Sequence, residues 1–162
     1  MNNILSKECD GMKKLIALVL MLICMLGLVG CSNHQEEVVT LSFRGEHEYF
    51  AISNGSIILN DSEEVFEGGN LEIVKPNLFV DVGSFSTAFY TVRNEEKHII
   101  LSNSVIDQTG SEVNISGDLG KIAGSDIIGR EIESIDNLWF ELKTTDLNGK
   151  ENVYQLQLTL TD

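Results

Sequence analysis

Residues 138–160 have the sequence LWFELKTTDLNGKENVYQLQLTL, and this stretch decides the predicted fold. Apolar and polar residues alternate on both sides of an Asn-Gly pair, which is the pattern of two half-buried β-strands joined by a tight turn. A two-residue turn would place Leu142 opposite Gln155, so that one side chain faced the core and the other faced solvent. A three-residue loop that ends at Gly149 places Leu142 opposite Tyr154 instead. We therefore predict this bulged loop, with Gly149 in the left-handed conformation. The other apolar positions then pair as well, Phe140 with Leu156 and Leu138 with Leu158.

Several stretches within residues 38–102 also alternate between apolar and polar residues and are rich in Val, Ile, Thr, Phe and Tyr, and the first of them, 38–43, is an expected strand. Within this region, Asn54-Gly55 predicts a two-residue type I′ hairpin turn, because Asn and Gly tolerate the positive φ that this turn needs. That turn would pair Phe50 with Leu59, apolar with apolar. Other strands are expected at 71–74, 84–93 and 98–102 (the last two joined by a four-residue loop, 94–97, with Val92 opposite Ile99), and shorter ones at 65–66 (an edge strand), 113–115 and 127–132.

The chain has 162 residues, of which 43% are hydrophobic and 22% are charged, and these are values of a globular protein. Short strands with regular turns between them predict one all-β domain over residues 38–162. Its expected architecture is an antiparallel β-sandwich, immunoglobulin-like or similar, of seven to nine strands. An open barrel is the alternative.

The first thirty residues have the order of a secretory signal peptide, which is expected to be helical. A basic start, residues 12–14, precedes an apolar run of fifteen residues, 15–29, and the small residue Gly30. Fifteen helical residues span about 22 Å, less than the ~30 Å hydrocarbon core, which disfavours a permanent transmembrane helix. Residues 1–11 are acidic where a signal peptide is basic, so Met12 is the expected true start.

Leu28-Val29-Gly30-Cys31 ends the apolar run. This tetrapeptide resembles the lipobox of bacterial lipoproteins, which is Leu, a small or branched residue, Gly or Ala, and then Cys. The resemblance implies that Cys31 receives a diacylglyceryl group and that signal peptidase II cuts between Gly30 and Cys31. It also implies a palmitate-type lipid anchor on the extracytoplasmic face of the cell membrane. Residues 31–37 would then form a polar tether.

The start of the predicted domain has a resemblance of its own. The segment Phe43-Arg44-Gly45-Glu46, which continues into Glu48-Tyr49-Phe50 and Asn54-Gly55, is similar to the opening of small uncharacterised lipoproteins from low-GC Gram-positive bacteria. The resemblance implies a Gram-positive surface location and no particular activity.

The net charge of the chain is -14, and residues 31–162 contain 8 basic and 23 acidic residues, a net charge of -15. This excess of acid disfavours nucleic acid and bare anionic lipid as partners, because both present phosphates. After the expected cleavage only Cys31 remains of the three cysteines. A disulfide framework, a cysteine-based zinc site and a free cysteine nucleophile are therefore not expected.

The sequence contains no recognisable catalytic arrangement. His34, His47 and His98 stand alone, and Gly120-Lys121 lacks the first glycine and the Ser or Thr of a phosphate-binding loop. We therefore expect no enzyme and no cofactor. The leading hypothesis is a lipid-anchored, non-catalytic binding module that recognises a surface protein or a glycan.

Two features remain as candidate sites. Asp61, Glu63 and Glu64 crowd one loop and offer the oxygen ligands that calcium prefers. Trp139 alternates with Leu138 and Phe140, so it is expected to point away from the core and to be available to a ligand. Two alternative functions follow, a cell-wall glycan enzyme or accessory subunit with paired acidic loop residues, and a calcium-stabilised adhesin domain. The sequence leaves the ligand, the oligomeric state and the strand order open.

Overall fold

The computed structural model describes residues 38–107, 113–128, 135 and 137–161. The chain separates after Gln35 into two units, and every described residue belongs to the second unit, residues 36–162. The predicted signal peptide, lipobox and tether lie outside the described residues. Within the described ranges, no helix is long and apolar enough to span a membrane.

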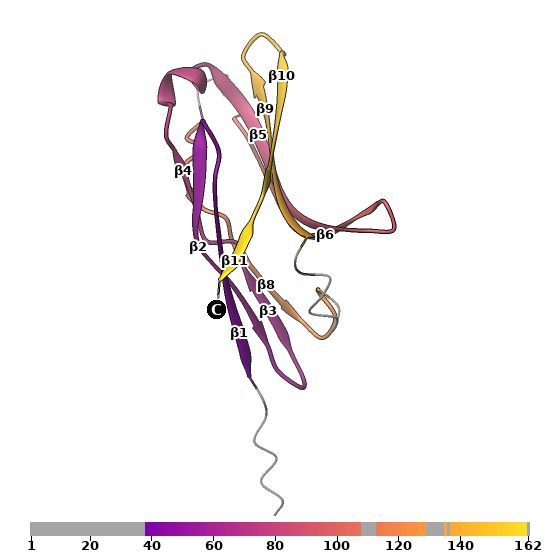
Figure 1. Ribbon diagram of the computed structural model, residues 1–162. Helices are drawn as coiled ribbons and strands as arrows, with labels where there is room; N and C mark the ends of the chain where they lie inside the picture. Colours follow the sequence, from indigo (N-terminus) through magenta and orange to yellow (C-terminus); the bar gives the residue numbers. More distant parts are fainter. Residues whose placement is uncertain (1–37, 108–112, 129–134, 136, 162) are drawn as a thin grey trace, which may run out of the picture. The chain divides into compact units, whose positions relative to one another are not determined.

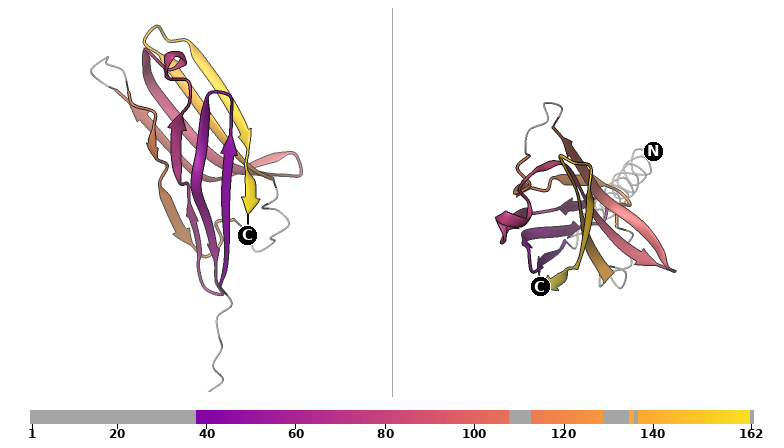
Figure 2. Two further views of the ribbon diagram at one scale, coloured as in Figure 1. Left: turned by 60° about the vertical axis from the view of Figure 1, so that its left-hand side comes forward. Right: turned by 90° about the horizontal axis from the view of Figure 1, so that it is seen from above.

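Two antiparallel sheets pack face to face and confirm the predicted all-β sandwich (Figures 1 and 2). Sheet A has the strand order β11-β1-β2-β3-β8, with β4 beside β2 and β7 beside β4, and sheet B has the order β10-β9-β5-β6. The elements are β1 (Val39–Glu46), β2 (Phe50–Leu59), β3 (Glu64–Glu67), β4 (Asn70–Ile73), the 3₁₀-helix η1 (Pro76–Leu78), β5 (Val82–Arg93), β6 (Glu96–Ile106), β7 (Gly117–Asp118), β8 (Lys121–Gly124), β9 (Leu138–Asp146), β10 (Glu151–Gln157) and β11 (Thr159–Thr161).

The C-terminal hairpin, β9 and β10, forms as predicted and links the two sheets. Leu142 lies opposite Tyr154, and Gly149 ends the loop with a φ of +83°. The second strand breaks at Leu158, whose backbone N–H still donates to the Leu138 carbonyl at 2.9 Å. Beyond the break, β11 pairs with β1 in sheet A. Figure 1 shows this yellow segment crossing from one sheet to the other.

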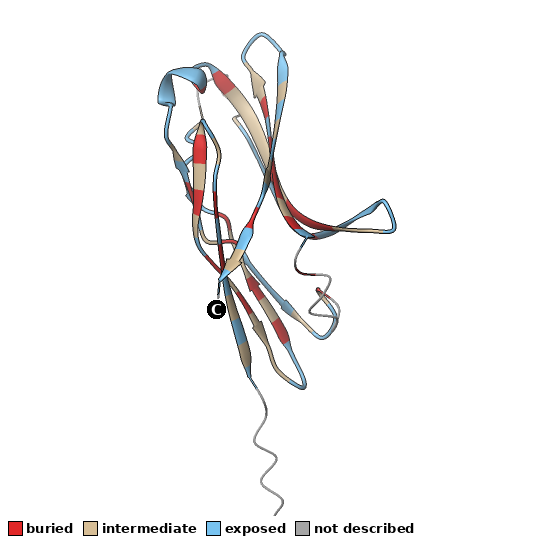
Figure 3. Ribbon diagram, in the orientation of Figure 1, coloured by how far each residue is buried: buried red, intermediate tan, exposed pale blue. Residues whose placement is uncertain are grey.

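Five phenylalanines fill the space between the sheets. Each of them is at most 1% exposed: Phe43, Phe50 and Phe66 from sheet A, and Phe89 and Phe140 from sheet B. The ring centroids of Phe66 and Phe89 are 5.0 Å apart, and those of Phe50 and Phe140 are 5.7 Å apart. Both pairs meet edge to face, which is a favourable arrangement of aromatic rings. These contacts cross between the sheets, so the buried residues in Figure 3 form one shared core.

The predicted turn at Asn54-Gly55 is wrong, because both residues lie inside the continuous strand β2. Asn54 has a φ of +57° and forms a β-bulge, and the β1–β2 register shifts between Phe43 and Gly45. The connection between β1 and β2 lies instead at residues 47–49. The positive φ of Asn54 therefore bends a strand and does not reverse the chain.

Sheet A contains a line of such irregularities. Beside the bulge of β2, Gly69 separates β3 from β4 with a φ of +74°, and Gly120 separates β7 from β8 with a φ of +90°. The N–H of Gly68 donates to the carbonyl of Gly120 at 2.8 Å, so hydrogen bonding continues across the line. These breaks divide strands into short segments. The described residues consequently form eleven segments and not the seven to nine strands expected.

The β5–β6 hairpin is tighter than the predicted four-residue loop. Asn94 and Glu95 form a two-residue turn in which both φ values are positive, +51° and +68°. As a result, Val92 pairs with Lys97 and not with Ile99. The register differs from the prediction by two residues as far as the Tyr90–Ile99 pair, and by one residue beyond the irregularity between Phe89 and Tyr90, where Leu101 lies opposite Phe89. A one-residue shift reverses the faces, so the β6 side chains from Leu101 onward lie on the face opposite to the predicted one. The position of β5 between β6 and β9 confirms its predicted central place.

Three shorter segments differ from the prediction. Residues 64–67 form β3, which pairs with both β2 and β8 and is therefore not an edge strand. Residues 113–115 form no strand, and the short strands that follow them are β7 and β8. Residues 127–128 lie in a bend, and the rest of the predicted strand at 127–132 falls outside the described residues.

Candidate functional site

The outer face of sheet B is the surface that points away from the shared core. We define it by the side chains of Trp139, Glu141, Lys143 and Thr145, which alternate along β9 with the buried Leu138, Phe140 and Leu142, together with their cross-strand neighbours on β5, β6 and β10. Several of these neighbours are small: Ser84, Ser86 and Ala88 on β5, and Ser102 and Ser104 on β6. Small side chains beside long ones leave a shallow trough along this face.

Trp139 is half-buried and lines a separate hollow on the same face, beyond the Ala88 end of the trough. Its ring is stacked with that of Tyr90 on β5, with 6.5 Å between centroids and 13° between planes. The Lys97 ammonium lies 4.3 Å from the centroid of the Tyr90 ring, a cation–π contact. Tyr90 is consequently only 3% exposed, and burial raises the pKa of its hydroxyl. Trp139 and Tyr90 thus form an aromatic floor, and Val92, Lys97, Asn137 and Gln155 also line the hollow.

Glu141 is the charged centre of the face. It is only 8% exposed, and its Oε2 accepts hydrogen bonds from Lys97 Nζ and Gln155 Nε2, both at 2.7 Å. Lys143 Nζ lies 3.4 Å from Oε1. Burial acts to raise the pKa of Glu141, but the bonds from Lys97 and Gln155 and the charges of both lysines hold that pKa below its ordinary value of 4.5. The carboxylate therefore stays ionised and orients the side chains around Trp139.

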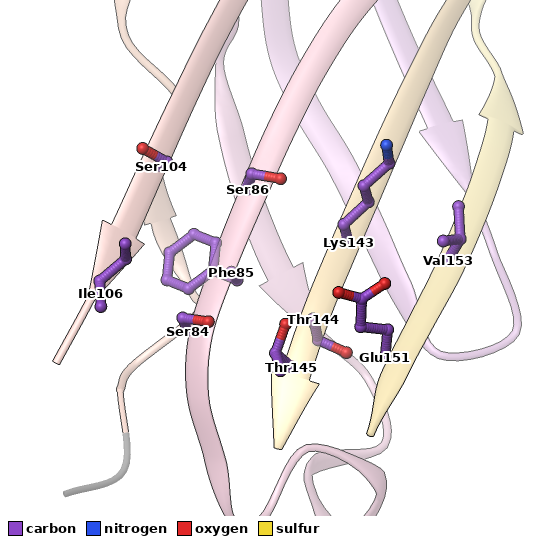
Figure 4. Close-up of a pocket in the computed structure, with 10 residues that line it drawn as sticks. All are labelled: Ser84, Phe85, Ser86, Ser104, Ile106, Lys143, Thr144, Thr145, Glu151 and Val153. Atoms are coloured by element: carbon purple, nitrogen blue, oxygen red, sulfur yellow. The ribbon is translucent and has the colours of Figure 1, made fainter. Parts of the chain in front are cut away.

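The Ser84 end of the trough is open and is lined by polar side chains and by the apolar side chains of Phe85, Ile106 and Val153. Figure 4 shows Ser84 and Ser86 of β5 between the side chains of β6 and those of β9, with Glu151 and Val153 at the β10 edge. The hydroxyl groups of Ser84, Ser86 and Thr145 face this space. A ligand in the trough would meet hydroxyl groups here, and a ligand long enough to extend past Glu141 would also reach the aromatic ring of Trp139.

The charges of the outer face cancel. Among its described residues, Lys97 and Lys143 are matched by Glu141 and Glu151. This neutrality contrasts with the net charge of -15 on residues 31–162. The face therefore lacks the local acid excess that characterises the rest of the domain.

The acidic residues of the predicted calcium site do not act together. Asp61 and Glu63 are exposed, whereas Glu64 is 4% exposed. Its Oε2 accepts hydrogen bonds from the backbone N–H groups of Ile127 at 2.8 Å and Ile128 at 2.7 Å. Glu64 thus fixes the loop that follows β8. In the part of the chain that the structure describes, no three His, Cys, Asp or Glu side chains are grouped to hold a metal ion.

The histidines lie away from this face or outside the described residues. The His47 ring stacks on Phe50 with 4.7 Å between centroids, and it also contacts Tyr49 and Tyr154. His98 is an exposed residue of β6. His34 lies outside the described residues, as do Cys31 and the other lipobox residues, Leu28, Val29 and Gly30.

Sequence reasoning found Trp139 but missed Tyr90, Lys97 and Glu141 as its neighbours. The alternation of β9 already placed Glu141 on the same face as Trp139, so that signal was available. Lys97 was hidden because the predicted loop 94–97 contained it. The observed turn moves Lys97 into β6, opposite Val92, and brings it next to Tyr90.

Comparison with protein-family models, curated proteins and solved structures found no match to this chain.

Proposed function

We propose that this chain is a lipid-anchored lipoprotein of the extracytoplasmic face of the membrane, and that it acts as a non-catalytic binding module through the outer face of sheet B. The lipobox-like sequence that ends at Cys31 supports the anchor. The observation that supports the binding face is the half-buried Trp139, stacked on Tyr90 and flanked by an ordered polar network. An apolar floor with a few fixed polar groups is the usual composition of a ligand site.

The chemistry of Glu141 favours binding over catalysis. A general acid needs a proton to donate, but Lys97 and Gln155 hold the Glu141 carboxylate as an anion. The other carboxylate of the face, Glu151, pairs with Thr145 four residues along β9. Four strand residues span about 13 Å, more than the ~5–9.5 Å that separates the two acids of a glycosidase. The pair therefore suits orientation of a ligand better than bond cleavage.

The anchor is tested by the substitution Cys31→Ala. We expect the variant to incorporate no labelled palmitate and to leave the membrane fraction or accumulate uncut, whereas the unchanged chain is labelled and sediments with membranes. A variant that is still acylated and normally cut would contradict the proposed anchor.

The binding face is tested on intact cells with a photoreactive amino acid at one of two exposed serines. Ser104 lies on the outer face of sheet B, and Ser62 lies in the loop between β2 and β3. We expect a covalent adduct from position 104 and none from position 62. Equal capture from both positions, or capture from 62 alone, would place the binding surface elsewhere.

A further inference from the structure

We infer that the ligand of the outer face is an uncharged, extended polysaccharide strand, with one sugar ring stacked on Trp139 and the following rings lying along the trough. This inference rests on the binding function proposed above and names its ligand class. Three observations lead to it: the aromatic floor, the hydroxyl-lined trough and the cancelled charge.

The aromatic floor fits the flat apolar face of a pyranose ring. Trp139 is half-buried, so its ring is held against Tyr90 while part of it stays accessible. Tyr90 has a fixed position because Lys97 covers its ring. A ring that is immobile before binding loses little conformational entropy when a ligand stacks on it. The amide groups of Gln155 and Asn137 line the same hollow and can hydrogen-bond to sugar hydroxyls.

The trough fits a chain rather than a single sugar. Hollows follow β5 from Tyr90 to Ser84, six residues or about 20 Å of strand, and the Lys97–Glu141 ion pair lies between the hollow at Trp139 and the serine-lined trough. The floor of this trough is made of small residues, and its far end is lined by hydroxyl groups that both donate and accept hydrogen bonds, together with the apolar side chains of Phe85, Ile106 and Val153. An extended strand of sugars would lie along this shallow surface, with its hydroxyl groups next to those of the serines and of Thr145.

The charge of the face selects an uncharged polymer. Lys97, Lys143, Glu141 and Glu151 cancel, and Lys97 is already bonded to Glu141. A phosphate-containing polymer would need a surplus of free cations, which the described residues of this face do not provide. A basic peptide would be attracted to the acidic surfaces elsewhere on the domain in preference to this one.

The single tryptophan of the chain makes the inference directly testable. Trp139 is the only Trp in the sequence, so its emission reports on this site alone. The full-length chain is purified in a detergent without a sugar headgroup and titrated with hexamers of β-1,4-linked glucose and of N-acetylglucosamine. We expect a saturable change in emission with at least one hexamer, a weaker effect of the disaccharide, and none with poly(glycerol phosphate) or polylysine.

Variants separate stacking from a structural role, with binding measured by calorimetry. Trp139→Ala should lower the affinity at least about tenfold, as truncation of an aromatic anchor does, and Trp139→Phe should restore most of it. Gln155→Ala should lower it by a smaller factor. The matched control is Leu78→Ala, a substitution of an exposed residue on η1 that should leave the affinity unchanged.

Several outcomes would overturn the inference. Trp139 emission that does not respond to either hexamer excludes the polysaccharide, as does equal affinity of the Trp139→Ala and unchanged chains. Preferential binding of poly(glycerol phosphate) would show that the ligand is anionic. If position 104 captures a protein on cells while both hexamers fail, the binding face stands and its assigned ligand class is wrong. If position 104 captures nothing while a hexamer binds, the cellular binding function is the part that fails.

Discussion

Replacement of Gly55 by alanine tests the packing between Phe43 and the bulge of β2. A Cβ at this position would lie closer than 3.0 Å to three atoms of the Phe43 ring, where carbon atoms in contact are normally about 3.5–4.0 Å apart. Phe43 has little room to move, because its ring centroid is 5.2 Å from that of Phe66 and 5.8 Å from that of Phe89. Overpacking of a core costs about 1–3 kcal/mol, and loss of a buried phenylalanine about 3–5 kcal/mol. We expect Gly55→Ala to lower the free energy of unfolding by about 2–4 kcal/mol.

The assay is urea denaturation of residues 36–162 followed by Trp139 fluorescence, with Gly55→Ala made in two backgrounds. Phe43→Val removes the ring atoms that the new methyl group would meet. In that background the substitution should be neutral or stabilising by about 0.5 kcal/mol, since Gly55 has no positive φ and alanine is the better strand residue. If Gly55 were instead the second residue of a type I′ turn, Gly55→Ala would lower the free energy of unfolding by about 1–2 kcal/mol whether position 43 held Phe or Val. Equal costs in the two backgrounds would therefore refute the packing argument.

Three further predictions concern the turn, the buried acid and the charged network. Glu95→Gly should raise the free energy of unfolding by about 1 kcal/mol in urea titrations, because Glu95 has a φ of +68° that glycine adopts without strain. A loss of stability would contradict the positive φ of Glu95 in this two-residue turn. Glu64→Ala should lower the free energy of unfolding by about 2–4 kcal/mol, because it leaves the N–H groups of Ile127 and Ile128 without an acceptor. Glu64→Gln keeps an acceptor oxygen and should retain more than half of that free energy. A loss below about 1 kcal/mol in the alanine variant would show that Glu64 does not hold this loop. The pKa of Glu141 is lowered and that of Lys97 is raised, so their stabilising contribution is present at neutral pH and is lost below about pH 4.5 and again above about pH 10.5. Glu141→Gln should flatten the pH dependence of unfolding at both ends, and an unaltered profile would mean that the network adds nothing to stability.

The sequence was sufficient for the C-terminal hairpin because two local requirements agreed. Only one loop length put Leu142 opposite Tyr154, and the same length put Gly149 where a positive φ was needed. At Asn54-Gly55 the same reasoning failed. A positive φ at Asn54 is needed for a bulge as well as for a turn, and local sequence does not distinguish the two. The decisive contact, Phe43 over Gly55, lies between different strands.

The candidate site was predictable only in part, for a similar reason. Alternation along one strand was enough to orient Trp139 away from the core. Its neighbours depend on the register of β5 with β6 and of β5 with β9, and that register depends on a turn at Asn94-Glu95 in which glutamate occupies a position that glycine favours. The metal hypothesis treated Glu64 as exposed, because nothing in its local sequence indicates that loop 125–128 covers it.

The crossing of the C-terminal segment between the sheets determines how the domain resists a pulling force. A load between the start of β1 and a ligand on sheet B would pass through Leu158 into β11. β1 and β11 are antiparallel, with Ser42 opposite Thr161 and Arg44 opposite Thr159. The two strands would then be pulled in opposite directions along their length, so their hydrogen bonds are sheared together and do not open one after another. Under the anchor at Cys31 and the ligand on sheet B that are proposed above, a force on the ligand would load the β1–β11 pair in this shearing direction.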